Sequence, residues 1–360
     1  MRVVSVVGAR PQFVKLAPVA HAMAVAGVEH VIIHTGQHYD PMLSDVFFTD
    51  LGIPAPDVHL GVGSGGHGAQ TGAMLAALDE ALPPLSADWV LVYGDTNSTL
   101  AAALAAVKLH IPVAHLEAGL RSFNRAMPEE INRVLTDHAA DLLLTPTRAG
   151  AEHLAAEGLQ ARTVVVGDVM TDVLLQVRDR VSGSPSPVME ELSLAEGSYS
   201  LATIHRAENT DDAERLEAVL DSLARVDHPV VILAHPRLVA KCAEHGLALE
   251  SRGSLLIHPP LAYPDLIASA LHARGVITDS GGLQKEAFLL RVPCTTVRPQ
   301  TEWVETVELG WNRLVEPGEA LVEAASRPRP AEPPQADAHP YGDGHAAERV
   351  VAELIAHLPG

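Results

Sequence analysis

Residues 89–133 read WVLVYGDTNSTLAAALAAVKLHIPVAHLEAGLRSFNRAMPEEINR and decide the fold class. The apolar runs Val90 to Tyr93 and Pro112 to Leu116 are each too short for a helix, and each ends in a polar cluster. An alanine-rich segment with helical spacing lies between them. The stretch therefore predicts a βαβ unit, in which a helix joins two parallel strands.

Carboxylates follow both predicted strands, with Asp95 after the first and Glu117 after the second. In open α/β sheets the ligand lies outside the carboxyl ends of the strands, so we expect these side chains to face one cleft. Glu129 and Glu130 follow Pro128 at a predicted helix start, where acids also interact favourably with the helix dipole. Crowded carboxylates shift one another's pKa, which indicates a site for proton transfer.

Length and composition bound the function. A chain of 360 residues exceeds the usual ceiling for a single core, which predicts two domains. The formal net charge of -20 argues against nucleic-acid or anionic-membrane partners. Cys242 and Cys294 lack metal-ligand spacing and no HExxH-like pattern occurs, so we expect neither a metal nor a cofactor. With no signal peptide and no membrane-length apolar run, we expect a cytoplasmic protein.

Strand and helix patterns alternate along both halves of the chain. The linker-like segment 181–187 places the domain boundary between Gly167 and Tyr199. We predict two doubly wound, Rossmann-like α/β domains facing a central cleft, the first over 1–167 and the second over 168–340. A last amphipathic helix within 341–360 is expected to pack back on the first domain.

Candidate anion ligands follow the first strand, Val3 to Val7. Arg10 and Lys15 lie in the next turn and helix start, where cations oppose the helix dipole and are more useful as anion ligands. Two solvated surface charges are the alternative interpretation. The glycine-rich segment 61–66 matches GxGxxG, but it follows a weak strand and has no acid after a second strand, so we reject a dinucleotide fingerprint.

The second half contains a candidate phosphate site. Ser280, Gly281 and Gly282 follow a predicted strand and open a helix, which presents free backbone N–H groups. The alternative is an ordinary helix capped by Ser280. His205 and Arg206 follow another strand, where His205 is placed to donate to a leaving phosphate. Arg298 begins a charged segment and is a further candidate ligand.

Several motifs together resemble the non-hydrolysing UDP-N-acetylglucosamine 2-epimerases, which have a GT-B-like fold. They are GARPQFVKLAP from Gly8, TGQHYD from Thr35, GDTNSTLAAALAA from Gly94, HLEAGLRS from His115, PEEINR from Pro128, HRAENTD from His205, TDSGGLQKEA from Thr278 and PYGDG from Pro340. The motifs extend over nearly the whole chain, and it is their order and spacing together that make the resemblance specific.

The resemblance implies roles for particular residues, a substrate and an oligomeric state. The matching catalytic groups are Asp95, Glu117, Glu129 and His205, and the matching nucleotide ligands are Arg10, Lys15, Ser280, Gly281, Gly282, Glu286, Arg206 and Arg298. Of these, Glu286 would bind the ribose hydroxyls. The resemblance also implies a UDP-sugar substrate, a homodimer and no metal.

The family chemistry accounts for these residue types. The hydrogen at sugar carbon 2 is not adjacent to a carbonyl, so simple enolisation cannot remove it. The resemblance implies elimination of UDP to 2-acetamidoglucal, followed by re-addition with the proton delivered to the opposite face. Acid and base groups, together with donors that hold UDP, are what such a sequence requires.

This chain also departs from better-known bacterial members. Residues 301–305 read TEWVE where many members have TERPE, and Leu266 replaces a base-stacking Phe, so uridine contacts are expected to differ. Gln37 and Arg206 match a regulatory substrate site, whereas Asp40 and Ala73 replace residues expected there. We therefore hypothesise weak or absent activation by bound substrate.

Three other functions compete with this interpretation. A hydrolysing epimerase would release UDP and free N-acetylmannosamine, but the GDTNST and HLEAGLRS motifs match the non-hydrolysing group. A glycosyltransferase would need an acceptor surface and fewer carboxylates. A binding protein without activity would have lost part of the acid and base set, and no part of it is missing.

Overall fold

A computed structural model describes residues 1–37, 54–334 and 339–358, and the side chain of Arg10 lies outside this description. The chain divides into unit 1, Met1–Val173 with Pro340–Gly360, and unit 2, Leu174–His339. Residues 42–51, whose sequence has helical spacing, lie outside the described residues.

Unit 1 contains a seven-stranded parallel sheet in the order β3-β2-β1-β4-β5-β6-β7. Its strands are β1 (Arg2–Val7), β2 (Glu29–His34), β3 (Val58–His59), β4 (Trp89–Tyr93), β5 (Val113–Leu116), β6 (Leu142–Thr145) and β7 (Thr163–Val165). Its helices are α1 (Arg10–Val25), α3 (His67–Ala81), α4 (Asn97–Lys108), α5 (Pro128–Ala139), α6 (Arg148–Ala156) and α16 (Ala346–Ala356), with 3₁₀ turns η1 (Pro83–Leu85) and η2 (Gln160–Arg162).

The central strands of unit 1, β1, β4, β5 and β6, are buried on both faces, which explains their nearly continuous apolar sequences. Because successive side chains alternate between faces, Val3 and Leu91 pack with α1 and α16, whereas Val4 and Val90 pack with α3 and α4. The sheet thus carries helices on both sides.

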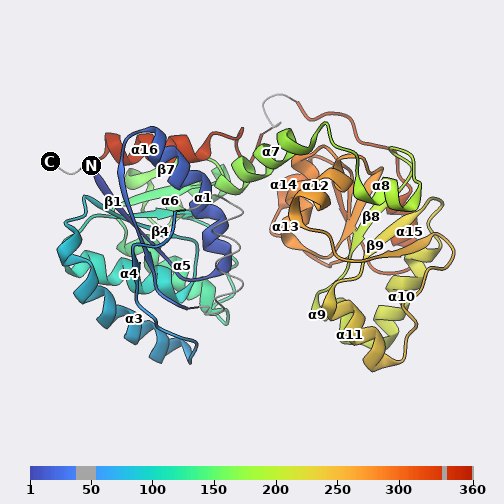
Figure 1. Ribbon diagram of the computed structural model, residues 1–360, viewed down its shortest axis with the longest axis horizontal. Helices are drawn as coiled ribbons and strands as arrows, with labels where there is room; N and C mark the ends of the chain where they lie inside the picture. The colour runs from blue at the N-terminus through green and yellow to red at the C-terminus, as the bar shows by residue number, and fades with distance from the viewer. Residues whose placement is uncertain (38–53, 335–338, 359–360) are drawn as a thin grey trace. The chain divides into compact units, whose positions relative to one another are not determined.

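The last helix, α16, packs against α1 in unit 1, as the red and blue helices show (Figure 1). Asp172 accepts from the backbone nitrogens of Ala346, at 3.1 Å, and Ala347, at 2.7 Å, so it satisfies the start of this helix. At the other end, the Trp89 indole donates to the Leu354 carbonyl at 3.0 Å. These contacts attach the end of the chain to the first sheet.

Unit 2 contains a six-stranded parallel sheet in the order β10-β9-β8-β11-β12-β13. Its strands are β8 (Ser200–Thr203), β9 (Val230–Leu233), β10 (Leu255–His258), β11 (Gly275–Thr278), β12 (Cys294–Thr296) and β13 (Asn312–Leu314). Its helices are α8 (Pro187–Leu192), α9 (Ala207–Thr210), α10 (Ala213–Ala224), α11 (Pro236–His245), α12 (Tyr263–Leu271), α13 (Gly281–Leu289), α14 (Val304–Glu308) and α15 (Glu319–Ala325), while α7 (Val169–Val181) crosses from unit 1.

The predicted α/β fold with two parallel sheets is confirmed. One strand, β13, was not predicted, because its three residues, Asn312, Arg313 and Leu314, lack an apolar run. None of the helices that the structure describes is long and apolar enough to cross a membrane.

Candidate active-site groups

Both sheets reverse their strand order at a point that carries the predicted polar turns. In unit 1 the reversal lies between the neighbouring strands β1 and β4: strands β2 and β3 follow on one side, and β5, β6 and β7 on the other. In unit 2 it lies between β8 and β11. Ligands of open α/β sheets bind at the carboxyl ends of strands beside such a reversal. Lys15 and Asp95 follow the first pair of strands, whereas His205 and Ser280 follow the second.

The turn after β1 is held by Gln12, which was not among the predicted residues. Its side-chain oxygen accepts from the backbone nitrogens of Gly8, at 2.8 Å, and Ala9, at 3.0 Å. Its nitrogen donates to the Tyr93 carbonyl at 2.9 Å. Gln12 therefore ties the start of α1 to the end of β4, where Asp95 follows.

Asp95 is paired with a cation from α5. An Arg133 nitrogen lies 2.5 Å from Asp95 Oδ2, and the Asn132 side chain donates to the Asp95 carbonyl at 2.9 Å. Burial lowers the pKa of Arg133, but Asp95 and Glu130 outweigh it and hold that pKa above the ordinary value. Arg133 thus remains a cation beside Asp95.

Glu117 is paired with Lys15 immediately after β5. Burial lowers the pKa of Lys15, but the Glu117 carboxylate outweighs it and raises that pKa above the ordinary value. Glu117 has a φ of 75°, in the left-handed region that costs free energy for a residue with a Cβ. Non-glycine residues in this region cluster at functional sites, which fits the predicted catalytic role.

The absence of a side chain at Gly94 leaves room for the ion pair between Lys15 and Glu117. Its φ is 62°, and an added Cβ would lie 3.2 Å from Glu117 Oε2 and 3.3 Å from Lys15 Nζ. Lys15, predicted as a nucleotide ligand, therefore contacts a predicted catalytic carboxylate in this structure. The two adjacent strand ends, β4 and β5, together present two carboxylates that each have their own cation.

The two acids at the start of α5 have different environments. Glu129 is exposed, whereas the side chain of Glu130 is 3% exposed. Glu130 accepts from the Ser122 backbone at 2.9 Å, the Phe123 backbone at 2.9 Å and Arg133 at 3.0 Å. Burial alone would raise the pKa of Glu130, but these donors hold it below the ordinary value. Glu130 anchors the chain, which leaves Glu129 available for chemistry.

In unit 2, Ser280, Gly281 and Gly282 begin α13 directly after β11. Ser280 has the N-cap position but makes no side-chain capping hydrogen bond. Its hydroxyl therefore does not cap the helix, as it would in an ordinary helix capped by Ser280. The start of α13 presents backbone N–H groups suited to an anion.

Asp279 holds the predicted His205 turn against this helix start. Its fully buried carboxylate accepts from the backbone nitrogens of His205, at 3.1 Å, and Arg206, at 2.9 Å, and from the Asn209 side chain at 3.1 Å. His205 Nδ1 lies 3.6 Å from Asp279 Oδ1, and its ring lies 4.9 Å from that of His235. Asp279 thus positions both His205 and Arg206.

Two predicted cations and an acid surround Gly281. A Cβ added at Gly281 would lie 2.2 Å from Glu302 Oε1 and 3.6 Å from Arg206 Nη2. Arg298 donates to the other oxygen of Glu302 at 3.0 Å. Arg206 and Arg298 therefore both lie near the start of α13. Glu302, which belongs to the TEWVE segment and was not predicted as a site residue, lies there too.

Glu286 lies one turn further along α13. Tyr263, the first residue of α12, donates its hydroxyl to Glu286 Oε1 at 2.9 Å. Burial raises the pKa of Glu286, and this hydrogen bond opposes the shift. Tyr263 was not predicted, because its contact with Glu286 joins two separate helices.

The predicted regulatory residues are only partly described. The Gln37 side-chain oxygen accepts from the Ser98 backbone at 3.0 Å and from the Ser98 hydroxyl at 2.7 Å, at the start of α4. Ala73 is exposed on α3, and Asp40 lies outside the described residues. Gln37 is thus engaged with the chain just after Asp95.

Unit 2 also contains a serine-histidine-aspartate arrangement that is closed to substrate. The Ser200 hydroxyl lies 2.7 Å from His228 Nε2, and His228 Nδ1 lies 2.7 Å from Asp227. Ser200 is only 1% exposed within β8, so it cannot act as a nucleophile. Cys294 is equally buried, and burial raises the pKa of its thiol to about 12. Among the described residues, no group of three His, Cys, Asp or Glu side chains could hold a metal ion.

Comparison with known proteins identifies relatives over the whole chain. Residues 21–355 match the family model described as UDP-N-acetylglucosamine 2-epimerase. A UDP-N-acetylglucosamine 2-epimerase homolog of Methanococcus maripaludis is 44% identical, over 98% of this chain and 99% of the relative. The UDP-2,3-diacetamido-2,3-dideoxy-D-glucuronate 2-epimerase of Pseudomonas aeruginosa is also 44% identical, over 99% of this chain and 100% of the relative.

Solved structures agree with these relatives. The UDP-GlcNAc 2-epimerase of Methanocaldococcus jannaschii is 38% identical and matches with a TM-score of 0.85, over 99% of this chain and 100% of that one. A structure of the same enzyme in complex with UDP-GlcNAc and UDP matches with a TM-score of 0.79, at the same identity and coverage. The fold is therefore GT-B-like, and the chain belongs to the UDP-N-acetylglucosamine 2-epimerase family.

Proposed function

We propose that this protein catalyses the reversible, non-hydrolysing epimerisation of UDP-N-acetylglucosamine to UDP-N-acetylmannosamine at carbon 2. One observation carries the proposal. Asp95 and Glu117 follow the adjacent strands β4 and β5, and each is held beside its own cation, Arg133 or Lys15. Proton transfer at a carbon that is not activated by a carbonyl requires positioned acid and base groups, and two carboxylates beside cations can serve as these groups.

In the first step, a carboxylate removes the proton from carbon 2. The electron pair of that C–H bond forms the C1–C2 double bond, and the C1–O bond breaks with its electron pair leaving on UDP. The products of this step are 2-acetamidoglucal and UDP, so no oxidant or reductant is needed. Asp95, Glu117 and Glu129 share the proton transfers.

In the second step, the β-phosphate oxygen of UDP adds back to carbon 1, and a carboxylic acid delivers a proton to the other face of carbon 2. The stereochemistry at carbon 2 is thereby inverted. After this step one group holds the proton taken from carbon 2 and the other has lost its own, so proton exchange with water restores both before the next turnover. Acid and base groups are required in both directions because the reaction is reversible.

UDP binding is assigned to the start of α13 and the cations near it. The backbone N–H groups of Ser280, Gly281 and Gly282 and the side chains of Arg206 and Arg298 would hold the diphosphate, because they supply positive charge and fixed donors. His205, positioned by Asp279, would stabilise the departing phosphate oxygen. Glu286 would accept from the ribose hydroxyls.

A second substrate has specific support. The Pseudomonas aeruginosa relative, named for a UDP-diacetamido-dideoxyglucuronate, is as similar in sequence as the Methanococcus maripaludis relative. The same chemistry at carbon 2 would serve a sugar that carries a second acetamido group and a carboxylate at carbon 6. The two sugar nucleotides are therefore compared as substrates under the same conditions, by kcat/KM.

Proton NMR of the protein with UDP-N-acetylglucosamine in deuterated water tests the proposed function. We expect UDP-N-acetylmannosamine that carries deuterium at carbon 2. Free N-acetylmannosamine with UDP would instead indicate the hydrolysing reaction. An unchanged spectrum with either sugar nucleotide would contradict the proposal and favour a transferase or a binding protein on the same fold.

A further inference from the structure

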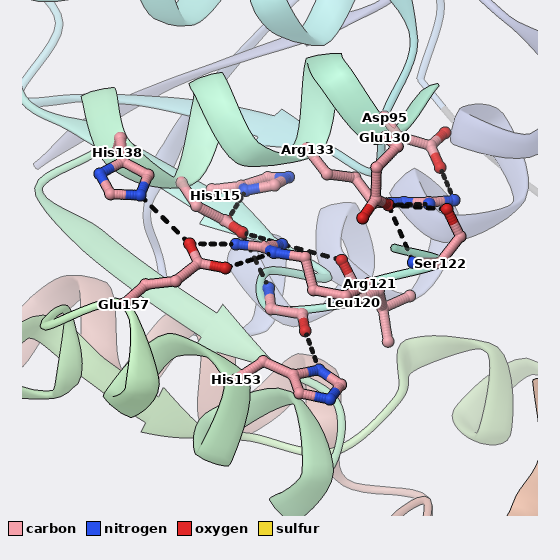
Figure 2. A network of polar contacts seen from close by, with 12 residues as sticks. Asp95, His115, Leu120, Arg121, Ser122, Glu130, Arg133, His138, His153 and Glu157 are labelled. Atoms are coloured by element: carbon pink, nitrogen blue, oxygen red, sulfur yellow. Dashed lines mark hydrogen bonds and ion pairs between the residues drawn. The ribbon is translucent and has the colours of Figure 1, made fainter. Parts of the chain in front are cut away.

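A chain of polar side chains connects His115 on β5 to Glu157 (Figure 2). His115 contacts Asp137 through Nδ1 at 2.6 Å, and Asp137 contacts Arg121 at 2.7 Å. Arg121 in turn donates to Glu157 at 2.7 Å and 2.9 Å. The side chains of His115 and Asp137 are 0% exposed, and that of Arg121 is 1% exposed. Burying the charges of Asp137 and Arg121 is costly unless they are paired and hydrogen-bonded.

The two nitrogens of His115 face two hydrogen-bond acceptors. Nε2 lies 2.7 Å from the Gly94 carbonyl oxygen, which can only accept. Nδ1 faces Asp137, whose pKa is held below the ordinary value by His115 and Arg121 although burial opposes this, so that it is a carboxylate. Because a carbonyl oxygen only accepts, Nε2 must donate to Gly94, while Nδ1 lies against the Asp137 carboxylate.

The same pair holds the chain on both sides of the proposed carboxylates. Gly94, whose carbonyl accepts from His115, directly precedes Asp95. The other oxygen of Asp137 accepts from the Gly119 backbone at 3.1 Å, two residues after Glu117. The buried contact between His115 and Asp137 therefore fixes the turn after β4 and the turn after β5 relative to each other.

We propose that His115, paired with Asp137, is a positioning residue for this reaction, which sets the separation of Asp95 and Glu117. This inference rests on the proposed function. His115 does not contact the reacting atoms, because it lies within β5 and both nitrogens are occupied. Its effect passes through the backbone at Gly94 and Gly119.

Neither an apolar residue nor an amide at position 115 could hold both turns in the same way. Glutamine at this position would donate through its nitrogen to one acceptor and would turn its oxygen toward the other. The turn that faces the amide oxygen would then move away. Because a displacement of about 1 Å in a catalytic group can cost roughly 10²-fold in rate, a small shift here has a large effect.

The experiment compares wild-type protein with His115→Gln and with a matched control, His30→Gln. His30 is a half-buried histidine of the same sheet, and its Nε2 contacts the Ser5 hydroxyl at 2.8 Å. It lies near the amino-terminal end of β2, away from the carboxyl ends that carry the proposed groups. Both variants are checked for folding by circular dichroism, and kcat and KM are measured for conversion of UDP-N-acetylglucosamine.

We expect His115→Gln to lower kcat roughly 10²-fold with KM changed less than about twofold, while His30→Gln keeps the wild-type kcat. Equal kcat in wild-type and folded His115→Gln would overturn the inference and leave the proposed function standing. A wild-type protein without epimerase activity on either sugar nucleotide would overturn both.

A second readout does not depend on activity. In protein labelled with ¹⁵N-histidine, the His115 ring should show a proton on Nε2 that exchanges slowly with water, because Nε2 donates to the Gly94 carbonyl. The resonances are assigned by their loss in His115→Gln, or by their shift in Asp137→Asn if the first variant does not fold. A ring without a proton on Nε2 would overturn the inference.

Discussion

Arg133 on α5 donates to the Asp95 carboxylate at the end of β4, with the two atoms 2.5 Å apart. The same guanidinium donates to Glu130 at 3.0 Å, and Glu130 holds the backbone of Ser122 and Phe123. Arg133 therefore connects a proposed catalytic carboxylate to the segment between β5 and α5. Its removal should alter the position of Asp95.

Arg133→Met keeps the length of the side chain and removes its charge and donors. We expect kcat for epimerisation to fall at least about 10²-fold, because Asp95 loses the cation that orients it. The control is Arg178→Met, which breaks an exposed pair with Asp179 and should leave kcat unchanged. Wild-type kcat in folded Arg133→Met would contradict the role given to this pair.

Glu129→Gln removes an exposed carboxylate in the first turn of α5, where its charge interacts favourably with the helix dipole. We expect a loss of kcat between about 10² and 10⁴, the range for an acid or base group, with the free energy of unfolding reduced by less than about 1 kcal/mol. Activity is measured by the appearance of UDP-N-acetylmannosamine, and stability by urea unfolding. Full activity would exclude Glu129 from proton transfer.

Glu130→Gln, the neighbouring substitution, should act mainly on stability. The Glu130 carboxylate is buried and accepts several hydrogen bonds, so we expect a loss of about 1–3 kcal/mol at pH 7. Its folded-state pKa lies below the ordinary value of 4.5, so this stabilisation is present above that value and is lost as the pH falls through the folded-state pKa. Urea unfolding of both proteins from neutral to acid pH would show the difference shrink, and a constant difference would contradict the account.

Gly94→Ala places a Cβ against the ion pair of Lys15 and Glu117. The left-handed φ alone should cost about 1–2 kcal/mol, and the contact should also reduce kcat. Gly158→Ala is a matched control, because its φ is 81° and an added Cβ would meet nothing within 4 Å. Both variants should lose similar stability, but Gly158→Ala should retain wild-type kcat. Equal kcat in the two variants would show that the space at Gly94 is not needed.

Tyr263→Phe removes the hydroxyl that donates to Glu286. Burial already raises the pKa of Glu286, and the loss of this donor should raise it further, so that less of the carboxylate is ionised. We expect UDP to bind about fivefold more weakly, which corresponds to about 1 kcal/mol, with a smaller deficit as the pH rises. Calorimetric titration with UDP at two pH values measures this. Tyr199→Phe, which removes a hydrogen bond to the Ser269 carbonyl in the same unit, should leave UDP affinity unchanged.

The elements that the sequence predicts best are buried parallel strands. Val90 to Tyr93 is an unbroken apolar run because both faces of β4 are covered, and its position also predicts where Asp95 must lie. The edge strand β13 has no such run and could not be predicted. Local pattern is therefore informative where burial is complete, whereas β13 carries no such pattern.

The partners of the candidate residues depend on contacts between distant parts of the chain. Lys15 and Glu117 are 102 residues apart, and no local pattern indicates that they form an ion pair. The different environments of Glu129 and Glu130 likewise follow from the backbone path of residues 122–123, which the sequence of α5 does not contain. Residue types could be predicted from the sequence, but their pairing required the fold.

The most direct test of the proposed elimination uses UDP-N-acetylglucosamine with ¹⁸O in the bridge between carbon 1 and the β-phosphorus. If the C1–O bond breaks, the β-phosphate of the released UDP rotates, and its oxygens become equivalent before re-addition. We predict that the sugar nucleotide recovered from the reaction carries ¹⁸O in non-bridging positions, as read from the ³¹P spectrum. Epimerised product with all of its ¹⁸O still in the bridge would contradict cleavage of the C1–O bond.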